Sequence, residues 1–247
     1  MAWEIPGQRA EGGRATRDFA GEAANGFSQV LAAESARAFM ARVYRWMFAG
    51  LAITGGVALF TAASPTVLEA VAPLRFALII GELVLVFALS WAAPRMSGPV
   101  AGLMFVAYAA INGLLFAFLF YVYELGSIGH AFLLTAGVFG ALSLYGTVTK
   151  KDLSAWASFL FIGLVGVMIA GVVQVFLQSE GLSFVWSCAC VVVFAGLTAY
   201  DTQKLRQFHA NTGYSSEAAL SVVGALMLYL DFINLFLALL RLVGRRR

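Results

Sequence analysis

Residues 153–177 read LSAWASFLFIGLVGVMIAGVVQVFL and contain no charged residue. A helix needs about 20 predominantly apolar residues to cross a bilayer, so this stretch is long enough to span one. The whole chain of 247 residues has the same character, because 61% of its residues are hydrophobic and only 12% are charged. Soluble domains are about 45–50% apolar and about 25% charged. The composition therefore excludes a soluble domain and a disordered chain, and two cysteines are too few for a disulfide scaffold.

Six further apolar runs of similar length are separated by proline or by polar residues. The runs are too long for strands and do not alternate between apolar and polar positions, so we expect an all-α polytopic membrane protein. Residues 1–45 form the only long polar stretch, which we predict to be a cytoplasmic tail before a transmembrane domain at 46–247. The predicted spans are residues 46–63, 74–93, 99–123, 130–149, 153–177, 182–203 and 221–243.

The distribution of basic residues predicts the orientation of the chain, because Lys and Arg accumulate in cytoplasmic loops. With a cytoplasmic N-terminus, most of the 16 Lys and Arg residues lie inside, and the predicted outside loops contain only Arg75. Arg241 and residues 245–247 then lie outside and violate the rule. Two explanations stay open: the last segment is re-entrant, or the earlier loops overrule its charges. We interpret the pI of about 9.0 as topology signal and contact with lipid head groups, not as nucleic-acid binding.

Three of the 13 acidic residues lie within apolar runs, namely Glu82, Asp201 and Asp231. A carboxylate in mid-bilayer costs about 2.5–3.5 kcal/mol, so such residues normally face the interior of a helix bundle and mark ion or proton pathways. Helical spacing places Asp231 and Asn234 on one face of the last span. The purely structural alternatives are an interfacial pair of Asp201 with Lys204, a hydrogen-bonded core position for Asp231, and a protonated or partly buried Glu82.

Asp201 and Asp231 have a definite chemistry if the fold brings them together. Two carboxylates close to each other do not both stay ionised cheaply, so they share a proton and respond to pH. They also form an oxygen-rich, negative site of the kind that Ca²⁺ prefers. Asp231 lies about 15 Å along the helix from residue 221, whereas Asp201 is close to the end of its span. The two can meet only if the sixth helix continues beyond Lys204 or the seventh begins nearer Glu217.

No complete enzymatic motif is present in the sequence. Tyr200 and Asp201 match one half of the intramembrane aspartyl protease signature, but residues 228–230 have bulky side chains where the other half requires glycines. The only histidines, His130 and His209, lie in separate loops or span edges and do not form the His-Glu-x-x-His motif of a zinc protease. We therefore expect no enzymatic activity and no resident cofactor.

Two of the acidic residues lie in distinctive segments, GLTAYDTQK at 196–204 and LMLYLDFINLF at 226–236. The segments FGALSLYG at 139–146 and TKKDLS at 149–154 are equally distinctive. Together they resemble the two acidic helices, the fourth helix and the following turn of the BAX inhibitor-1 family, the transmembrane BAX inhibitor motif proteins with bacterial members of the YccA and YbhL type. The resemblance extends from about residue 44 to the C-terminus.

The resemblance implies a seven-helix fold in which the last helix is central and is wrapped by the other six. It also implies a pH-sensitive Ca²⁺ leak, in which Asp201 and Asp231 form the pH-sensing pair and contact the permeating ion. Glu82 matches an acid of the channel-type members. Arg95 is the candidate for the arginine that holds the closed state through the pair, although it stands beyond Pro94.

The same resemblance permits a second role, in which the bundle binds and modulates a membrane-bound AAA protease or another membrane protein. The polar tail, residues 1–45, is the part that such a protease could grip. The implied location is the inner membrane of a bacterium, with the lipid bilayer and Ca²⁺ as partners, and an endoplasmic reticulum location stays open.

Overall fold

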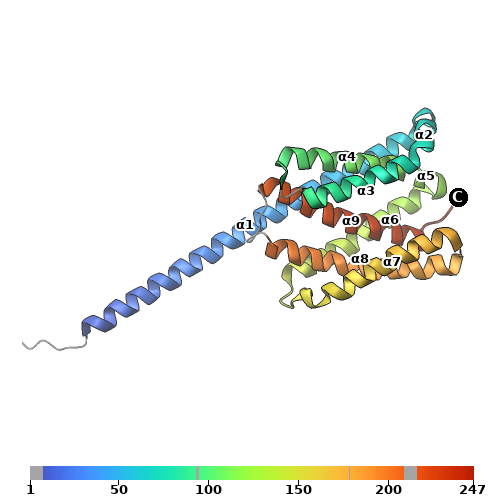
Figure 1. Cartoon of the computed structure of the whole chain (residues 1–247). Helices are drawn as coiled ribbons and strands as arrows, with labels where there is room; N and C mark the ends of the chain where they lie inside the picture. Colours follow the sequence, from blue (N-terminus) through green and yellow to red (C-terminus); the bar gives the residue numbers. More distant parts are fainter. Residues whose placement is uncertain (1–7, 93–94, 178, 209–215) are drawn as a thin grey trace, which may run out of the picture.

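The computed structural model describes residues 8–92, 95–177, 179–208 and 216–247, with side chains from residue 34 onward except those of residues 175 and 208. Within this part of the chain the structure is helical (Figure 1), apart from a bridge between Tyr123 and Arg246. In chain order the elements are α1 (Gln8–Ala63), α2 (Pro65–Val71), η1 (Ala72–Leu74), α3 (Arg75–Ala92), α4 (Gly98–Phe116), α5 (Leu119–Val122), α6 (Leu125–Val148), η3 (Leu153–Trp156), α7 (Ala157–Leu177), α8 (Glu180–Phe208) and α9 (Glu217–Val243).

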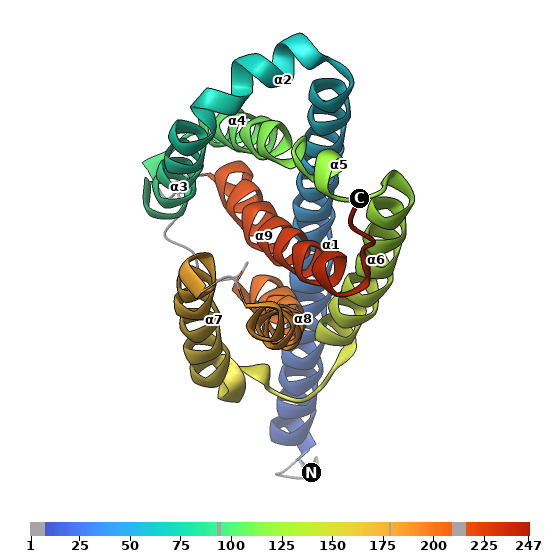
Figure 2. The same ribbon diagram turned by 90° about the vertical axis from the view of Figure 1, so that its right-hand side faces the viewer.

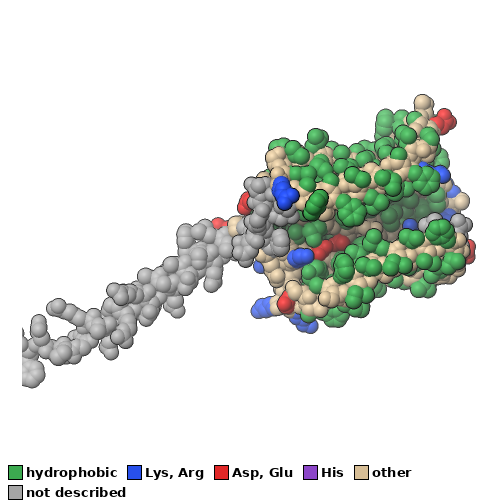
Figure 3. All heavy atoms as spheres, viewed as in Figure 1, with side chains coloured by type: hydrophobic (Ala, Val, Ile, Leu, Met, Phe, Trp, Pro, Cys, Tyr) green, Lys and Arg blue, Asp and Glu red, His purple; other side chains and the backbone are tan. Residues whose placement is uncertain are grey.

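Seven helical segments in the described part of the chain are long and apolar enough to cross a membrane. Large apolar side chains cover the flank of the bundle, as contact with lipid tails requires (Figure 3). The predicted all-α polytopic fold is therefore confirmed. The seven segments are Glu34–Ala63, Pro65–Ala92, Gly98–Val122, Leu125–Val148, Leu153–Gln174, Glu180–Gln207 and Glu217–Val243.

Helix α9 runs through the middle of the bundle and is surrounded by the other long helices (Figure 2). In its most apolar window 78% of the residues are buried, against 33% or less in each of the other six spans. It packs against α1, α4, α6 and α8. The central position expected for the last helix is confirmed. A polar residue on α9 therefore faces protein rather than lipid.

Proline and short polar side chains determine where several helices begin. Pro65 stands in the first turn of α2, where its missing N–H leaves no hydrogen bond unmade. At the start of α9 the hydroxyl of Ser216 accepts the backbone N–H of Ala219 at 3.4 Å. Asp152 caps η3 by accepting the N–H of Ser154 at 2.9 Å, and this hydrogen bond holds the pKa of Asp152 below its usual value.

Helix α1 is much longer than the predicted first span. It begins at Gln8 and continues without a break through residue 46, where the span was predicted to begin. The part of α1 that is long and apolar enough to cross a membrane lies within Glu34–Ala63. The part of α1 before the span projects away from the bundle as a single helix (Figure 1).

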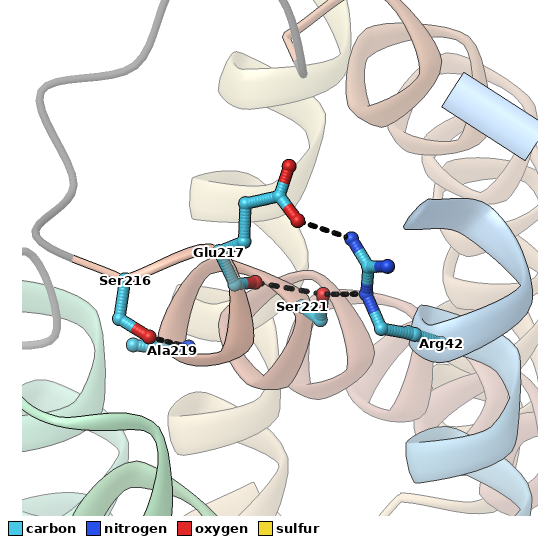
Figure 4. Close-up of polar contacts among 5 residues, drawn as sticks. All are labelled: Arg42, Ser216, Glu217, Ala219 and Ser221. Atoms are coloured by element: carbon cyan, nitrogen blue, oxygen red, sulfur yellow. Dashed lines mark hydrogen bonds and ion pairs between the residues drawn. The ribbon is translucent and has the colours of Figure 1, made fainter. Parts of the chain in front are cut away.

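Arg42 fastens α1 to the first turn of α9 (Figure 4). Its Nη2 atom lies 2.8 Å from Oε2 of Glu217, and its Nε donates to Oγ of Ser221 at 3.3 Å. The same Ser221 hydroxyl donates to the backbone oxygen of Glu217 at 2.8 Å. The ion pair is exposed, so it orients the two helices more than it stabilises them.

The ends of α8 and α9 also differ from the predicted spans. α8 extends to Phe208 rather than to residue 203, and α9 begins at Glu217 rather than at 221. Both helices continue past their apolar runs because residues such as Gln, Lys, Arg and Glu have good helix propensity. α9 is unbroken as far as Val243, which favours a full crossing over the re-entrant alternative.

Tyr229 anchors the core at the centre of α9. Its ring is fully buried and makes edge-to-face contacts with Phe105 and Tyr108, each with a centroid separation of 5.7 Å. Its hydroxyl lies 2.6 Å from Oγ1 of Thr54, which in turn donates to the backbone oxygen of Ala109 at 2.9 Å. Because the Thr54 proton is used in that bond, Tyr229 is the donor to Thr54.

Candidate functional site

A groove beside α9 contains the three acidic residues that lie within apolar runs of the sequence. Asp201 of α8, Asp231 of α9 and Glu82 of α3 line it, and its volume is about 530 Å³. Figure 3 shows acidic side chains inside a hollow in the apolar flank of the bundle. None of the described residues that line the groove is Lys, Arg or His. The remaining polar side chains of its wall are those of Tyr108, Asn112 and Asn234.

Asp201 and Asp231 meet in this groove because the helices that carry them are longer than their apolar runs. α8 continues past Lys204 to Phe208, and α9 begins at Glu217, so both conditions for the meeting are fulfilled. Asp201 is 9% exposed and Asp231 is 4% exposed. The charge of Asp201 acts on Asp231, whose Oδ2 is buried without a hydrogen-bond partner in the described structure. A buried carboxylate oxygen of this kind is unfavourable unless a proton or a cation compensates it.

Lys204 stands at the rim of the site, one helical turn beyond Asp201. Its side chain is exposed, and its Nζ lies 5.5 Å from the centre of the Tyr200 ring. Its charge acts on Asp201, but no ion pair joins the two side chains within the part of the chain that the structure describes. Asp201 is therefore a buried residue of the groove whose ionisation Lys204 influences from a distance.

Glu82 is held by two residues of α4. Oε1 of Glu82 accepts a hydrogen bond from Nδ2 of Asn112 at 2.6 Å, and the nearby hydroxyl of Tyr108 acts on the Glu82 carboxyl. Asn112 and Tyr108 further approach each other at 3.4 Å. Sequence reasoning missed these partners, although their spacing of four residues places two polar side chains on one face of an apolar helix.

Asn234, Arg95 and the two histidines, which the sequence also brought into question, lie in different parts of the chain. Asn234 lines the groove, and its Nδ2 donates to the backbone oxygen of Leu230 at 2.8 Å. Arg95 lies after the end of α3, is exposed, and is not among the described residues that line the groove. The structure therefore does not bring Arg95 to the aspartate pair. His130 is exposed near the start of α6, and His209 lies outside the described residues.

The residue after Asp201 fastens this part of α8 to its neighbours. Oγ1 of Thr202 lies 3.1 Å from Oγ of Ser143 in α6, and the same Ser143 hydroxyl hydrogen-bonds to the hydroxyl of Tyr44 in α1. Thr202 is fully buried. Three helices are thus joined by one chain of hydroxyl groups next to the aspartate pair.

Gln203 connects α8 to the turn between α6 and η3. Its Oε1 accepts the N–H of Leu153, and its Nε2 donates to the backbone oxygen of Lys151, both at 2.8 Å. Consecutive residues of a helix point about 100° apart, so Asp201, Thr202 and Gln203 face three different partners. The signal for Thr202 and Gln203 in the sequence was the run of three consecutive polar residues at 201–203.

The groove offers oxygen ligands from three carboxylates and two amides. Ca²⁺ takes six to eight oxygen ligands. No group of three His, Cys, Asp or Glu side chains that could hold a metal is found among the described residues. The carboxylates of Asp201 and Asp231 and the amide of Asn234 would contact an ion that keeps much of its water.

The fold and the groove define a polytopic membrane protein with a central last helix and a buried acidic pair. The sequence model of the family described as "Inhibitor of apoptosis-promoting Bax1" matches residues 36–247. The chain therefore belongs to the Bax inhibitor-1 family, and the resemblance seen in its motifs is confirmed.

Several bacterial proteins are similar to the chain over most of their length. The inner membrane protein YbhL of Escherichia coli is 45% identical over 215 residues, which are 85% of this chain and 92% of YbhL. A protein of Deinococcus radiodurans is 48% identical over 215 residues, with 86% of this chain and 93% of the relative covered. A Rickettsia prowazekii protein is 39% identical over 217 residues, which are 87% and 92% of the two chains. Neither the family description nor these names specify an enzymatic activity.

Proposed function

We propose that the protein provides a pH-sensitive pathway for cations, and for Ca²⁺ in particular, along the groove beside α9. One observation carries this proposal: Asp201 and Asp231 are buried together in a groove whose described wall contains Glu82 but no basic residue. Acidic groups without a fixed counter-charge attract cations and repel anions, and the low dielectric around them strengthens the effect. The groove therefore favours cations over anions by its charge alone.

The aspartate pair would respond to pH through the proton that its two carboxylates share. Two carboxylates at close range in apolar surroundings do not both ionise cheaply. The charge of the pair then changes by one unit when the shared proton leaves, and this titration belongs to the pair rather than to either residue. Lys204 at the rim acts on Asp201, and the other titratable groups on the groove wall are Glu82 and Tyr108. A change of one charge alters the attraction for a cation and the packing of α8 on α9.

The experiment is Ca²⁺ uptake by dye-loaded liposomes that contain the purified protein, stepped from about pH 8 to about pH 6. Wild type is compared with Asp201→Asn and Asp231→Asn, because asparagine keeps the shape of the side chain and removes its titration. The exposed Glu69, which does not line the groove, provides the matched control Glu69→Gln. We expect a pH-dependent flux that either groove variant flattens and the control keeps. Flux that is unchanged in both groove variants would contradict the proposal.

We also infer that the protein resides in the inner membrane of a bacterium with its N-terminus in the cytoplasm. The name of the related E. coli protein states an inner membrane location. The excess of Lys and Arg in the tail and in alternate loops supports the orientation. A cysteine introduced at residue 2 and labelled from one side of the membrane would test the orientation.

The projecting part of α1 favours a second candidate function, the binding of another membrane protein such as a membrane-bound protease. The N-terminal part of α1, which begins at Gln8, extends beyond the bundle (Figure 1). A partner could grip it without disturbing the groove. Purification from native membranes with and without residues 2–33 tests this role, since a specific partner must be lost with the helix. Recovery of no partner by the full chain would count against it.

A further inference from the structure

A second polar pocket lies at the opposite end of α9 from its N-terminus, and the cation pathway does not use it. The end of α7, the first turns of α8 and the end of α9 form its walls, and its volume is about 540 Å³. Arg241 and Arg246 line it from the C-terminal side. Gln174, Glu180 and Ser183 line it from the α7 and α8 side. These arginines belong to the basic C-terminal group that violates the expected charge distribution of the loops.

The two arginines are held close together without an acidic partner. The charges of Arg241 and Arg246 act on each other. No carboxylate forms an ion pair with either of them in the described structure. The guanidinium of Arg241 lies over the ring of Trp186, 4.3 Å from its centroid, which fixes its position. Two like charges confined to one pocket are unfavourable unless an anion lies between them.

Backbone contacts hold Arg246 in place, so its presence in the pocket is built into the fold. It forms an antiparallel bridge with Tyr123. On either side of it, the oxygen of Arg245 accepts the N–H of Glu124 at 3.1 Å, and the N–H of Arg247 donates to the oxygen of Val122 at 3.0 Å. The C-terminal residues are therefore a fixed part of the pocket wall rather than a free tail.

The far side of the pocket offers hydrogen-bond acceptors and borders on the lipid-facing surface. Oε1 of Gln174 is buried and has no partner in the described structure, while its Nε2 donates to the oxygen of Ser179 at 3.0 Å. The carboxylate of Glu180 lines the same side. Next to them Phe176 and Phe184 are 81% and 63% exposed on the apolar flank. A ligand of this pocket can thus have a polar head in it and an apolar part in the bilayer.

We propose that this pocket binds the phosphoethanolamine head group of a membrane phospholipid. The phosphate lies between the guanidinium groups of Arg241 and Arg246, which are the side chains best suited to hold phosphate oxygens. The ammonium group donates to the carboxylate of Glu180 and to Oε1 of Gln174. The phosphate thus complements the charges of the two arginines, and the ammonium complements the unpaired oxygen of Gln174. The acyl chains lie against the exposed side chains of Phe176 and Phe184.

The test is lipid binding by the full-length, delipidated protein in detergent, measured by native mass spectrometry. Phosphatidylethanolamine should bind in a one-to-one complex. The double variant Arg241→Gln/Arg246→Gln should weaken this binding at least about tenfold, because it removes both charged donors to the phosphate oxygens. The matched control Arg247→Gln changes a neighbouring arginine that does not line the pocket, and it should bind like wild type. Retention volume and helix content are compared to show that all variants fold.

Three further arms distinguish the head group from other anions. Phosphatidylcholine should bind at least about tenfold more weakly, since its quaternary ammonium donates no hydrogen bond to the acceptors. Glu180→Gln should reduce the preference for phosphatidylethanolamine over phosphatidylglycerol. Inorganic phosphate at millimolar concentration should not displace the lipid. Equal binding by the double arginine variant, equal binding of phosphatidylcholine, or displacement by inorganic phosphate would each overturn the proposal.

Discussion

Replacement of Gly146 by alanine tests how closely two helices approach next to the aspartate pair. Gly146 lies in α6 and faces Ala199 of α8, two residues before Asp201. A Cβ atom at residue 146 would overlap the backbone oxygen of Ala199. Because that oxygen belongs to the backbone of a helix, it cannot rotate away as the end of a side chain could. The variant must push α8 away from α6.

The expected cost follows from two effects at this crossing. Extra volume in a well-packed interior costs about 1–3 kcal/mol. A shift of α8 also breaks the hydrogen bond between Ser143 and Thr202, now 3.1 Å long, and a bond of this kind contributes about 0.5–1.5 kcal/mol. We therefore expect Gly146→Ala to lower the free energy of unfolding by about 1.5–4.5 kcal/mol.

The assay is unfolding in mixed micelles of a mild detergent with rising amounts of SDS, followed by circular dichroism. Gly140→Ala is the matched control, because Gly140 lies in the same helix and its added Cβ would meet nothing within 4 Å. The control should unfold like wild type or be up to about 1 kcal/mol more stable, because alanine has a higher helix propensity than glycine. If Gly146→Ala also unfolds within about 0.5 kcal/mol of wild type, the close α6–α8 contact is not present and the reasoning fails.

Three smaller predictions concern other contacts. Tyr229→Phe should lower the free energy of unfolding by about 0.5–1.5 kcal/mol, because it removes one buried hydrogen bond while Thr54 keeps its own bond to the backbone. A loss above about 3 kcal/mol in the same SDS titration would mean that the Tyr229 hydroxyl stabilises the fold by more than one hydrogen bond. Arg42→Gln removes the exposed ion pair with Glu217 and should cost only about 0.2–1 kcal/mol, less still in high salt (Figure 4). A salt-independent or larger loss would show that the pair is not screened. For Asp152, whose pKa is lowered by its capping bond, the stabilising contribution is present above the ordinary pKa of aspartate and is lost as the pH falls through the lowered value. Unfolding measured against pH should therefore show a small acid-side loss in wild type that Asp152→Asn lacks, and identical profiles would refute this.

Hydropathy and charge were enough to predict the membrane class, the seven spans and the three unusual acids. The reason is physical, since the length of an apolar run and the cost of burying a charge depend on the local sequence. The motifs at 139–146, 149–154, 196–204 and 226–236 together also identified the family, which the family match over residues 36–247 confirms. The central place of α9 was implied by that resemblance, and its burial bears this out.

Tertiary structure decided which polar groups share one site. Asp201 and Asp231 share a groove only because α8 and α9 extend beyond their apolar runs. Hydropathy gives little information about where a helix ends within polar sequence. The two polar partners of Glu82 come from another helix, so spacing along its own helix gave no sign of them.

For the basic residues, too, tertiary structure decided which of them lie at a site. The family resemblance made Arg95 a candidate partner of the pair, yet it lies exposed after the end of α3 and does not line the groove. In the sequence, Arg241 and Arg246 only violated the expected distribution of basic residues between the two sides of the membrane. The fold places both of them in one pocket. The sequence by itself determined which segments enter the membrane, because each residue carries its own transfer energy. Which charged groups face one another was decided by helix packing, because that depends on the crossing and length of helices distant in the chain.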